Sequence, residues 1–243
     1  MDNQNFILGQ EEAYNATVQT VWPFKKSEDV VEGINLKLSN MCGGFPIEAI
    51  GRTWPNSEVL YLCGEFTDPA IQQELLSVTS GYAAKRFIKA KHKKEVRADF
   101  EEFRLQWMLW VVWQKCLSSK AFRDLLMSIP DEVVLVEDTT TDNQGTADVW
   151  GCRNPELVAL RKAREAEVMA EHEDSGMTKK ALNHLIAVER NRIRDHGTWV
   201  GQNNIGKIIM ICREAIKTGT VPQIDTDLLN SRNITILGQK VTF

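Results

Sequence analysis

The chain has 243 residues, 43% of them hydrophobic and 26% charged, and a formal net charge of -4 at neutral pH. These proportions are typical of a globular protein and argue against bulk, non-specific nucleic-acid binding, although they allow a local basic patch. The N-terminus lacks the basic region and apolar core of a secretory signal, and the most apolar run, 105–113, is shorter than the ~20 residues that span a bilayer. Five scattered cysteines without a CxxC pair indicate reduced thiols, so we expect a cytoplasmic protein with no membrane partner.

The first third of the chain changes from strand-like to helical character at residue 55. Residues 1–51 are predicted to form short strands and turns, because β-rich residues alternate there with glycine and proline. Pro55 suits the first turn of a helix, where its missing N–H is not needed, and Asn56 or Ser57 can cap that helix. Glu58 would then stand in an ordinary acidic first turn, or it has a catalytic role.

Two segments follow with opposite character. The stretch 83–97 is basic, which is typical of a solvated helix face but also of a surface that contacts phosphates. The stretch 99–117 is predicted to be the central core helix, since it is apolar nearly all round.

The second half is predicted to contain a helix over 122–129, a buried strand over 133–136 and a polar loop over 139–145. Residues 153–198 are charge-dense with weak apolar stripes, and their Pro, Gly and Thr signals predict a helical hairpin. The Gly- and Asn-rich turn 201–206 opens another helix and could present N–H groups to an anion. A β-hairpin is expected in the tail.

Six short motifs occur in order along the chain. They are Ser39-Asn40-Met41, Trp54-Pro55-Asn56-Ser57-Glu58, Arg97-Ala98-Asp99-Phe100, Met108 with Lys115-Cys116, Trp150-Gly151, and Gly201-Gln202-Asn203-Asn204-Ile205-Gly206. In this order they resemble the NADAR family of YbiA-type N-glycosidases.

The resemblance implies one mostly helical α+β domain with a small sheet, whose core comprises about residues 20–152 and 199–217. It leaves 153–198 as an inserted charged helical hairpin and 218–243 as a C-terminal extension. The chain departs from the family pattern at Glu65, where a lysine is usual, at Phe100, where a tryptophan is usual, and at Cys152 after the Trp-Gly pair. These differences bear on the identity of the substrate.

Members of the family are implied to cleave the bond between a ribose carbon and a nitrogen, without a metal or cofactor. The transition state has oxocarbenium character, so a carboxylate such as Glu58 would stabilise it, and a second acid would protonate the leaving nitrogen. Asp148 is the first candidate for that acid, with Glu137 or Asp138 behind it, although Asp148 also suits a turn. The implied substrate-binding residues are Asn40 and Asn203 for ribose, Trp54 and Trp150 for a base, and Arg52, Lys85, Arg97, Lys115 and the Gly201–Gly206 turn for phosphates. The two tryptophans are equally compatible with a core position, and Lys115 with a charge at a helix end.

The resemblance therefore implies a hydrolytic N-glycosidase that acts on an ADP-ribosyl conjugate, with ADP-ribosylated guanine in DNA or RNA as the leading candidate. Hydrolysis of a phosphoribosylamino pyrimidine of riboflavin synthesis is the alternative within the enzyme class. Two alternatives lie outside it: a protein that binds ADP-ribose or a related nucleotide without turnover, and a variant in which the hairpin mediates oligomerisation or docking. The sequence leaves the oligomeric state open.

Overall fold

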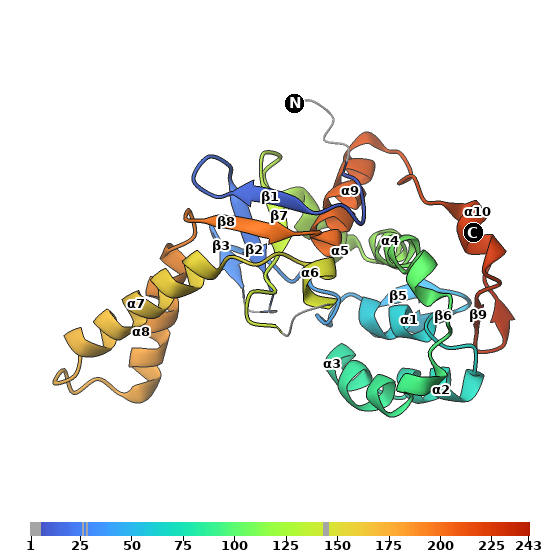
Figure 1. The fold of residues 1–243 in the computed structure, drawn as a ribbon, viewed down its shortest axis with the longest axis horizontal. Helices are drawn as coiled ribbons and strands as arrows, with labels where there is room; N and C mark the ends of the chain where they lie inside the picture. Colours follow the sequence, from blue (N-terminus) through green and yellow to red (C-terminus); the bar gives the residue numbers. More distant parts are fainter. Residues whose placement is uncertain (1–5, 26, 28, 143–145) are drawn as a thin grey trace.

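The computed structural model describes residues 6–25, 27, 29–142 and 146–243, and its fold is shown in Figure 1. It confirms the predicted α+β class, with most of the regular structure helical and the strands short. The predicted polar loop 139–145 lies partly outside the described residues. Among the described residues, no helix is both long and apolar enough to cross a membrane.

The strands come mainly from the N-terminal region and from three later segments. They are β1 (Glu12–Asn15), β2 (Val21–Phe24), β3 (Val30–Val31), β4 (Ile34–Asn35), β5 (Ile47–Ala49), β6 (Arg52–Trp54), β7 (Val134–Glu137), β8 (Thr198–Gly201), β9 (Thr235–Ile236) and β10 (Gln239–Lys240). The last two form the predicted tail hairpin, and their turn places Leu237 and Gly238 at positive φ. Strand β8 is not predicted from the sequence, because Gly201 indicates only a turn.

One set of strand pairings joins distant parts of the chain. Strand β2 pairs in parallel with β7, so that Phe24 lies opposite Glu137. Single bridges then connect Asp138 to Cys152 and Arg153 to Val200, and β8 runs antiparallel to β1. The C-terminal end of β7 is therefore held from both sides, which fixes the backbone at Glu137.

The helices cover this strand region and, together with β5, β6 and the tail hairpin, build a second, mainly helical layer. They are α1 (Ser57–Cys63), α2 (Pro69–Leu76), α3 (Gly81–Ala83), a π-helix (Ala84–Lys89), a 3₁₀-helix (Lys93–Glu95), α4 (Phe100–Ser118), α5 (Lys120–Ser128), α6 (Thr146–Trp150), α7 (Pro155–Glu171), α8 (Lys179–Arg192), α9 (Asn204–Thr218) and α10 (Thr226–Ser231). The basic stretch thus starts with a short α-helix that continues as a π-helix.

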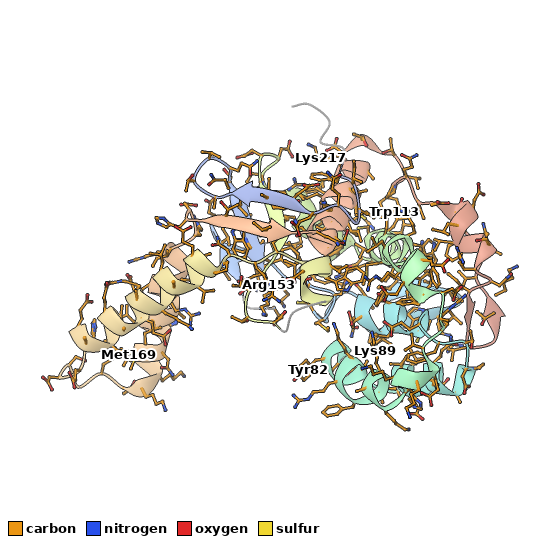
Figure 2. The ribbon with its side chains drawn as sticks, in the orientation of Figure 1. Tyr82, Lys89, Trp113, Arg153, Met169 and Lys217 are labelled. Atoms are coloured by element: carbon orange, nitrogen blue, oxygen red, sulfur yellow. The ribbon has the colours of Figure 1, made fainter. Side chains whose placement is uncertain are left out.

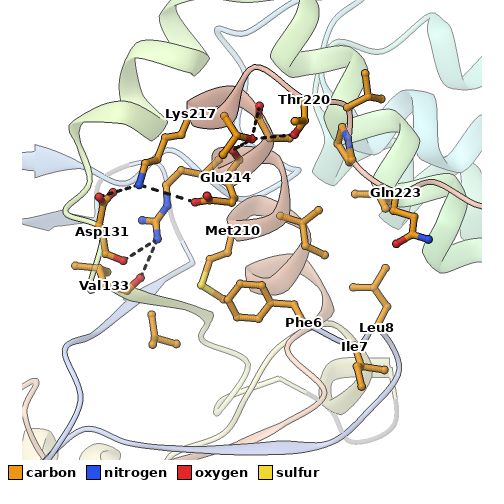
Figure 3. Close-up of a pocket in the computed structure, with 18 of the residues that line it drawn as sticks. Phe6, Ile7, Leu8, Asp131, Val133, Met210, Glu214, Lys217, Thr220 and Gln223 are labelled. Carbon is orange, nitrogen blue, oxygen red and sulfur yellow. Dashed lines mark hydrogen bonds and ion pairs between the residues drawn. The ribbon is translucent and has the colours of Figure 1, made fainter. Parts of the chain in front are cut away.

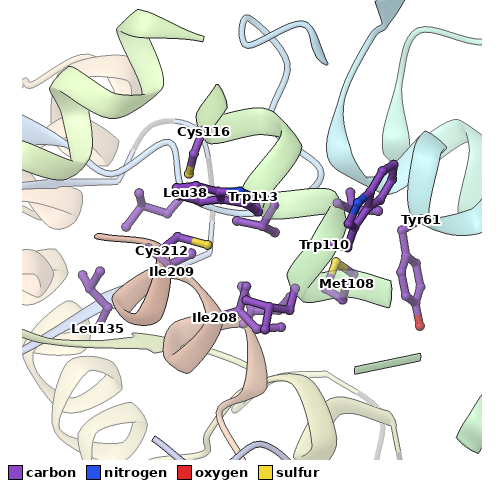
Figure 4. Packing of buried hydrophobic residues seen from close by; sticks show 14 of the residues in the cluster. Leu38, Tyr61, Met108, Trp110, Trp113, Cys116, Leu135, Ile208, Ile209 and Cys212 are labelled. Carbon is purple, nitrogen blue, oxygen red and sulfur yellow. The ribbon is translucent and has the colours of Figure 1, made fainter. Parts of the chain in front are cut away.

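The core forms where α4 meets α9 and α1, as Figure 4 shows for the cluster around Trp113, Ile208 and Cys212. This confirms the prediction of a buried central helix at 99–117. Trp107 stacks on Trp110 with ring centroids 4.9 Å apart. The Trp107 indole N–H donates to the carbonyl of Tyr61 over 3.0 Å, so α4 also fixes the backbone of α1.

Helices α7 and α8 form a hairpin that projects away from the rest of the molecule (Figure 1). Arg164 on α7 pairs with Glu189 on α8 at 3.1 Å, and the Arg161 guanidinium donates to the carbonyl of Ile193. Buried apolar side chains on the two helices, such as Val168 and Ile186, complete the contact. That this hairpin is an insertion stays a prediction.

Candidate active site

Glu58 is held rigidly at the first turn of α1. Asn56 caps this helix, its side-chain oxygen accepting from the backbone N–H of Val59 at 3.0 Å, as the sequence predicted. The backbone N–H of Glu58 donates to the carbonyl of Asn40 at 3.2 Å, which anchors the helix to the preceding loop. The Glu58 side chain is only 6% exposed, so water solvates its charge poorly.

Two lysines of the π-helix face carboxylates of α1 and of the segment that follows it. Lys85 Nζ lies 3.7 Å from Glu58 Oε1, beyond ordinary hydrogen-bonding distance, and its side chain is 51% exposed. Lys89 Nζ lies 2.6 Å from Glu65 Oε1. Burial raises the pKa of Glu65, and Lys89 opposes that rise. The loose Glu58–Lys85 pair leaves room for a ligand group, whereas the Glu65–Lys89 pair is closed.

Glu137 is a second carboxyl group within the electrostatic field of Glu58. It ends β7 and is partly buried. Burial, opposed by Lys85 and reinforced by Glu58, raises the pKa of Glu137 from its ordinary 4.5 to about 8. At neutral pH Glu137 is therefore mostly protonated. Two carboxyl groups whose environments differ in this way can divide the roles of base and acid.

The Trp-Gly and Gly-Asn motifs support the strand that carries Glu137. A Cβ on Gly151 would overlap the carbonyl of Glu137, and one on Gly206 would overlap the carbonyl of Leu135. Asn203, at positive φ, accepts from the Glu137 N–H at 3.2 Å and donates to the Leu135 carbonyl at 2.9 Å. These residues bring α9 and α6 against β7, and only glycine allows so close an approach.

This arrangement corrects two predicted binding residues. Asn203 is fully buried and both ends of its side-chain amide are used by β7, so it cannot hold a ribose hydroxyl. Gly201 is packed against Gly151, and the N–H groups of Gln202 and Asn203 donate to the carbonyls of Asp148 and Gly151. Two of the N–H groups expected to bind phosphate are thus engaged within the protein.

The two predicted stacking tryptophans have different surroundings. Trp54 is completely buried and its indole N–H donates to the Ala49 carbonyl at 2.9 Å, so the prediction that it stacks on a base is corrected. Trp150 is half-buried above α1, with its ring edge-on to Tyr61 at 5.5 Å. The Arg104 guanidinium lies 5.7 Å from the Trp150 ring centroid. Trp150 therefore stays a candidate for base stacking.

Of the other predicted binding residues, Asn40 and Arg97 are engaged within the protein, whereas Arg52 is exposed. Asn40 lies beside Glu58, but its side-chain amide contacts the sulfur of Met108 and is buried. Arg52 is exposed on β6 and forms no ion pair with any described residue. Arg97 pairs with Asp99 at 2.7 Å and donates to the carbonyl of Arg232 at 2.7 Å, so its cation is committed to holding the C-terminal segment.

Asp148, the first candidate for the second acid, pairs with Arg153. Its side chain is 47% exposed, and the Arg153 guanidinium engages one of its carboxylate oxygens. The geometry therefore favours Glu137 over Asp148 as the proton donor, which reverses the order that the sequence indicated.

Lys115 is enclosed in the core, which corrects its prediction as a phosphate ligand. Its ammonium lies 4.0 Å from the ring centroid of Phe122 and 5.2 Å from that of Phe45. It has no hydrogen-bond partner among the described residues. Burial lowers the pKa of Lys115 from 10.5 to about 8.

We expect Lys115→Met to stabilise the protein at pH 7, because methionine removes a buried cation and keeps an aliphatic side chain. Between pH 8 and 10.5 the folded parent has lost the Lys115 proton and the unfolded chain retains it, so parent stability should rise across that window and the variant should lack the rise. Urea unfolding at several pH values measures both effects. Lys120→Met, at a side chain 79% exposed, is the control, and a less stable Lys115→Met at pH 7 would contradict the prediction.

Gly81 fixes the distance between α3 and α1. A Cβ at this position would lie 2.9 Å from the Glu58 Cβ and 3.3 Å from the Met41 Cα. We expect Gly81→Ala to lower the free energy of unfolding by about 1–3 kcal/mol, since neither neighbour can move freely. Gly43→Ala is the matched control, because a Cβ there meets nothing within 4 Å. Equal stability of the two variants in urea unfolding would show that α3 can shift.

A groove of about 1300 Å³ lies elsewhere, between the segment 6–8 and helix α9 (Figure 3). Its two cations have partners within the protein: Lys217 pairs with Asp131 at 2.8 Å, and Arg213 donates to the carbonyl of Val133. None of the residues predicted from the sequence as site residues lines this groove. It therefore adds nothing to the site around Glu58.

Two residues of the site are not identified well from the sequence: Glu137 ranks behind Asp148 as the second acid, and Arg104 is not predicted at all. Arg104 is half-buried on the core helix α4, where it pairs with Glu101 at 2.9 Å and faces Trp150. A cation next to the apolar run of the core helix was the signal that could have identified it. Glu137 had the corresponding signal of a carboxyl group that immediately follows a buried strand.

Comparison with known proteins supports the fold. The NMR structure of the E. coli protein YbiA is similar to this chain at 22% sequence identity with a TM-score of 0.51, and the match covers 83% of this chain and 87% of YbiA. No family model and no curated protein matches the chain. At this identity the likeness concerns the architecture alone, and the chain has a YbiA-like fold.

Proposed function

We propose that the protein is an N-glycosidase of the NADAR type, which hydrolyses the bond between a ribose carbon and a nitrogen in an ADP-ribosyl conjugate. The observation that carries the proposal is the unequal pair of carboxyl groups: Glu58 beside Lys85, and Glu137 with a pKa raised to about 8. The YbiA-like fold and the order of the six motifs support it.

The reaction follows from these two groups. Glu137 gives its proton to the departing nitrogen as the C–N bond breaks, and the negative charge of Glu58 stabilises the positive charge that develops on the ribose. A water molecule then adds to the ribose carbon and gives its proton to Glu58. Proton transfer back to Glu137 restores the starting state, so no metal or redox group enters the balance.

The remaining side chains suit a nucleotide. Trp150, with Arg104 on one side, offers a half-exposed ring for a base. Lys85 is exposed enough to contact a phosphate while it stays near Glu58. Glu65 stands where the resemblance expects a lysine, and Lys89 supplies a cation at the same place. This pair supports the view that the glutamate at position 65 changes which substrate is recognised, while a positive charge is kept at this place by Lys89.

The test is incubation of the protein with a panel of N-ribosyl compounds, read by mass spectrometry. The panel contains ADP-ribosylated guanine in a DNA oligonucleotide, ADP-ribose linked to free guanine, and a phosphoribosylamino pyrimidine. Release of free ADP-ribose supports the proposal. Hydrolysis of the pyrimidine compound alone would assign the protein to the riboflavin-type reaction, and tight ADP-ribose binding without any release would make it a binding protein.

A further inference from the structure

The segment that carries Lys85 also carries the two most exposed aromatic rings in the described part of the chain. Tyr82 is 56% and Phe87 62% exposed, whereas the other aromatic side chains described are buried or half-buried. Large apolar side chains in water are unfavourable, so such a pair on one short segment calls for an explanation. In Figure 2, Tyr82 lies at the outer edge of the helical layer.

Arg86 lies close to both rings. Its guanidinium carbon lies 5.6 Å from the ring centroid of Tyr82 and 5.9 Å from that of Phe87, and it donates to the Tyr82 hydroxyl. Arg86 has no carboxylate partner among the described residues. We call Tyr82, Arg86 and Phe87 the aromatic–arginine platform. It combines two π-faces with an uncompensated cation.

The charge around the platform is strongly positive although the whole chain is acidic. Residues 81–97 contain seven Lys or Arg and a single acidic residue, Glu95. Lys89 and Lys91 pair with Glu65 and Glu74, but Lys93 and Lys94 are exposed and form no ion pair with the described residues. The platform therefore has unpaired cations beside it that can contact phosphates.

The platform residues alternate along the chain with two residues that lie against Glu58. Gly81, the residue before Tyr82, packs against Glu58, and Lys85, the residue before Arg86, lies 3.7 Å from the Glu58 carboxylate. A ligand whose sugar reaches Glu58 can therefore extend along this segment. We propose that the platform binds unpaired nucleobases that flank the modified nucleotide, so that the substrate is a single-stranded nucleic acid.

This inference rests on the proposed function, because it extends the same site from one nucleotide to a strand. Aromatic rings and arginine planes are the groups on which unpaired bases stack, with little sequence preference. An anionic membrane would also attract a basic segment with aromatic rings. Gly81 and Lys85, which alternate with the platform residues along the segment, lie against Glu58, and this favours, over a membrane surface, a strand that continues from the sugar.

The test measures binding without catalysis. A fluorescent, unmodified single-stranded DNA of about 12 nucleotides, a length within the usual range of such sites, is titrated with protein and followed by anisotropy. Tyr82→Ala and Phe87→Ala are each expected to raise the Kd roughly 5- to 100-fold, the effect typical of a lost base–ring stack. Tyr82→Phe keeps the ring and should bind nearly as the parent does. Met169→Ala, at an exposed side chain on the distant hairpin, should have no effect (Figure 2).

Several outcomes would overturn the inference. They are unchanged binding by both alanine variants, equally tight binding of a duplex of the same length, and ring-dependent capture of phosphatidylserine vesicles without oligonucleotide binding. The outcome is separable from that of the proposed function. If Tyr82→Ala and Phe87→Ala weaken oligonucleotide binding and the parent hydrolyses none of the panel, the platform is supported and the glycosidase is rejected. Hydrolysis together with ring-independent DNA binding would support the glycosidase and reject the platform.

Discussion

Glu58→Gln is expected to lower the turnover of an N-ribosyl substrate by about 10²- to 10⁴-fold, the range typical of a lost catalytic base or charge-stabilising group. Glutamine has the same shape as glutamate but can neither accept the proton of the attacking water nor carry the negative charge opposite the oxocarbenium ion. Single-turnover hydrolysis, followed by release of ADP-ribose, measures the effect.

The structure offers a matched control for this variant. Glu65 lies just after the same short helix, is equally buried and pairs with Lys89, so Glu65→Gln removes a buried charge without touching the proposed chemistry. Thermal unfolding should show both variants folded, and Glu65→Gln should retain far more activity than Glu58→Gln. Normal turnover by Glu58→Gln would exclude the proposed mechanism, whatever Glu65→Gln does.

Glu137→Gln is expected to have two effects of opposite sign. Turnover should fall by about 10²- to 10⁴-fold, because glutamine cannot donate a proton to the leaving nitrogen. In the parent, the rate should decline as pH rises through about 8, where Glu137 loses its proton, and this alkaline limb should be absent from the residual activity of the variant. A pH–rate profile of both proteins measures these changes.

Stability should change in the other direction. Between pH 4.5 and about 8 the folded protein keeps the Glu137 proton while the unfolded chain has released it, so the parent loses stability as pH rises through this window. The glutamine side chain does not titrate, and the Glu137→Gln variant should therefore become more stable than the parent toward pH 8. Each kcal/mol gained corresponds to about 2–4 °C in Tm for a chain of this size.

Asp148→Asn separates the two candidates for the proton donor. Asp148 pairs with Arg153 at an exposed position, so its replacement should leave the alkaline limb of the pH–rate profile in place. If Asp148→Asn removes that limb and Glu137→Gln does not, the sequence-based ranking of the two acids is correct and the structural one is wrong.

Local sequence patterns were sufficient for the main helices. Asn56 and Pro55 mark the start of α1, and the apolar periodicity of 99–117 marks the buried α4, because both signals depend only on residues a few positions apart. The same reasoning placed Glu58 in the first turn of a helix. The ligand roles of Lys115 and Trp54 came from the resemblance, and both fail for the same reason: motifs give the residue types in order along the chain, but not how completely the next layer covers a side chain.

The sequence by itself determined an α+β chain with a carboxylate at a capped helix start, a buried central helix and a basic segment between them. Tertiary structure alone decided that Glu137, 79 positions after Glu58, shares its electrostatic field, since proximity across such a separation is set by the packing of β7, α6 and α9. It also showed that Gly151, Asn203 and Gly206 hold that strand in place. The pKa of a carboxyl group depends on how much water the surrounding fold removes from it, and no local pattern of residues records that quantity.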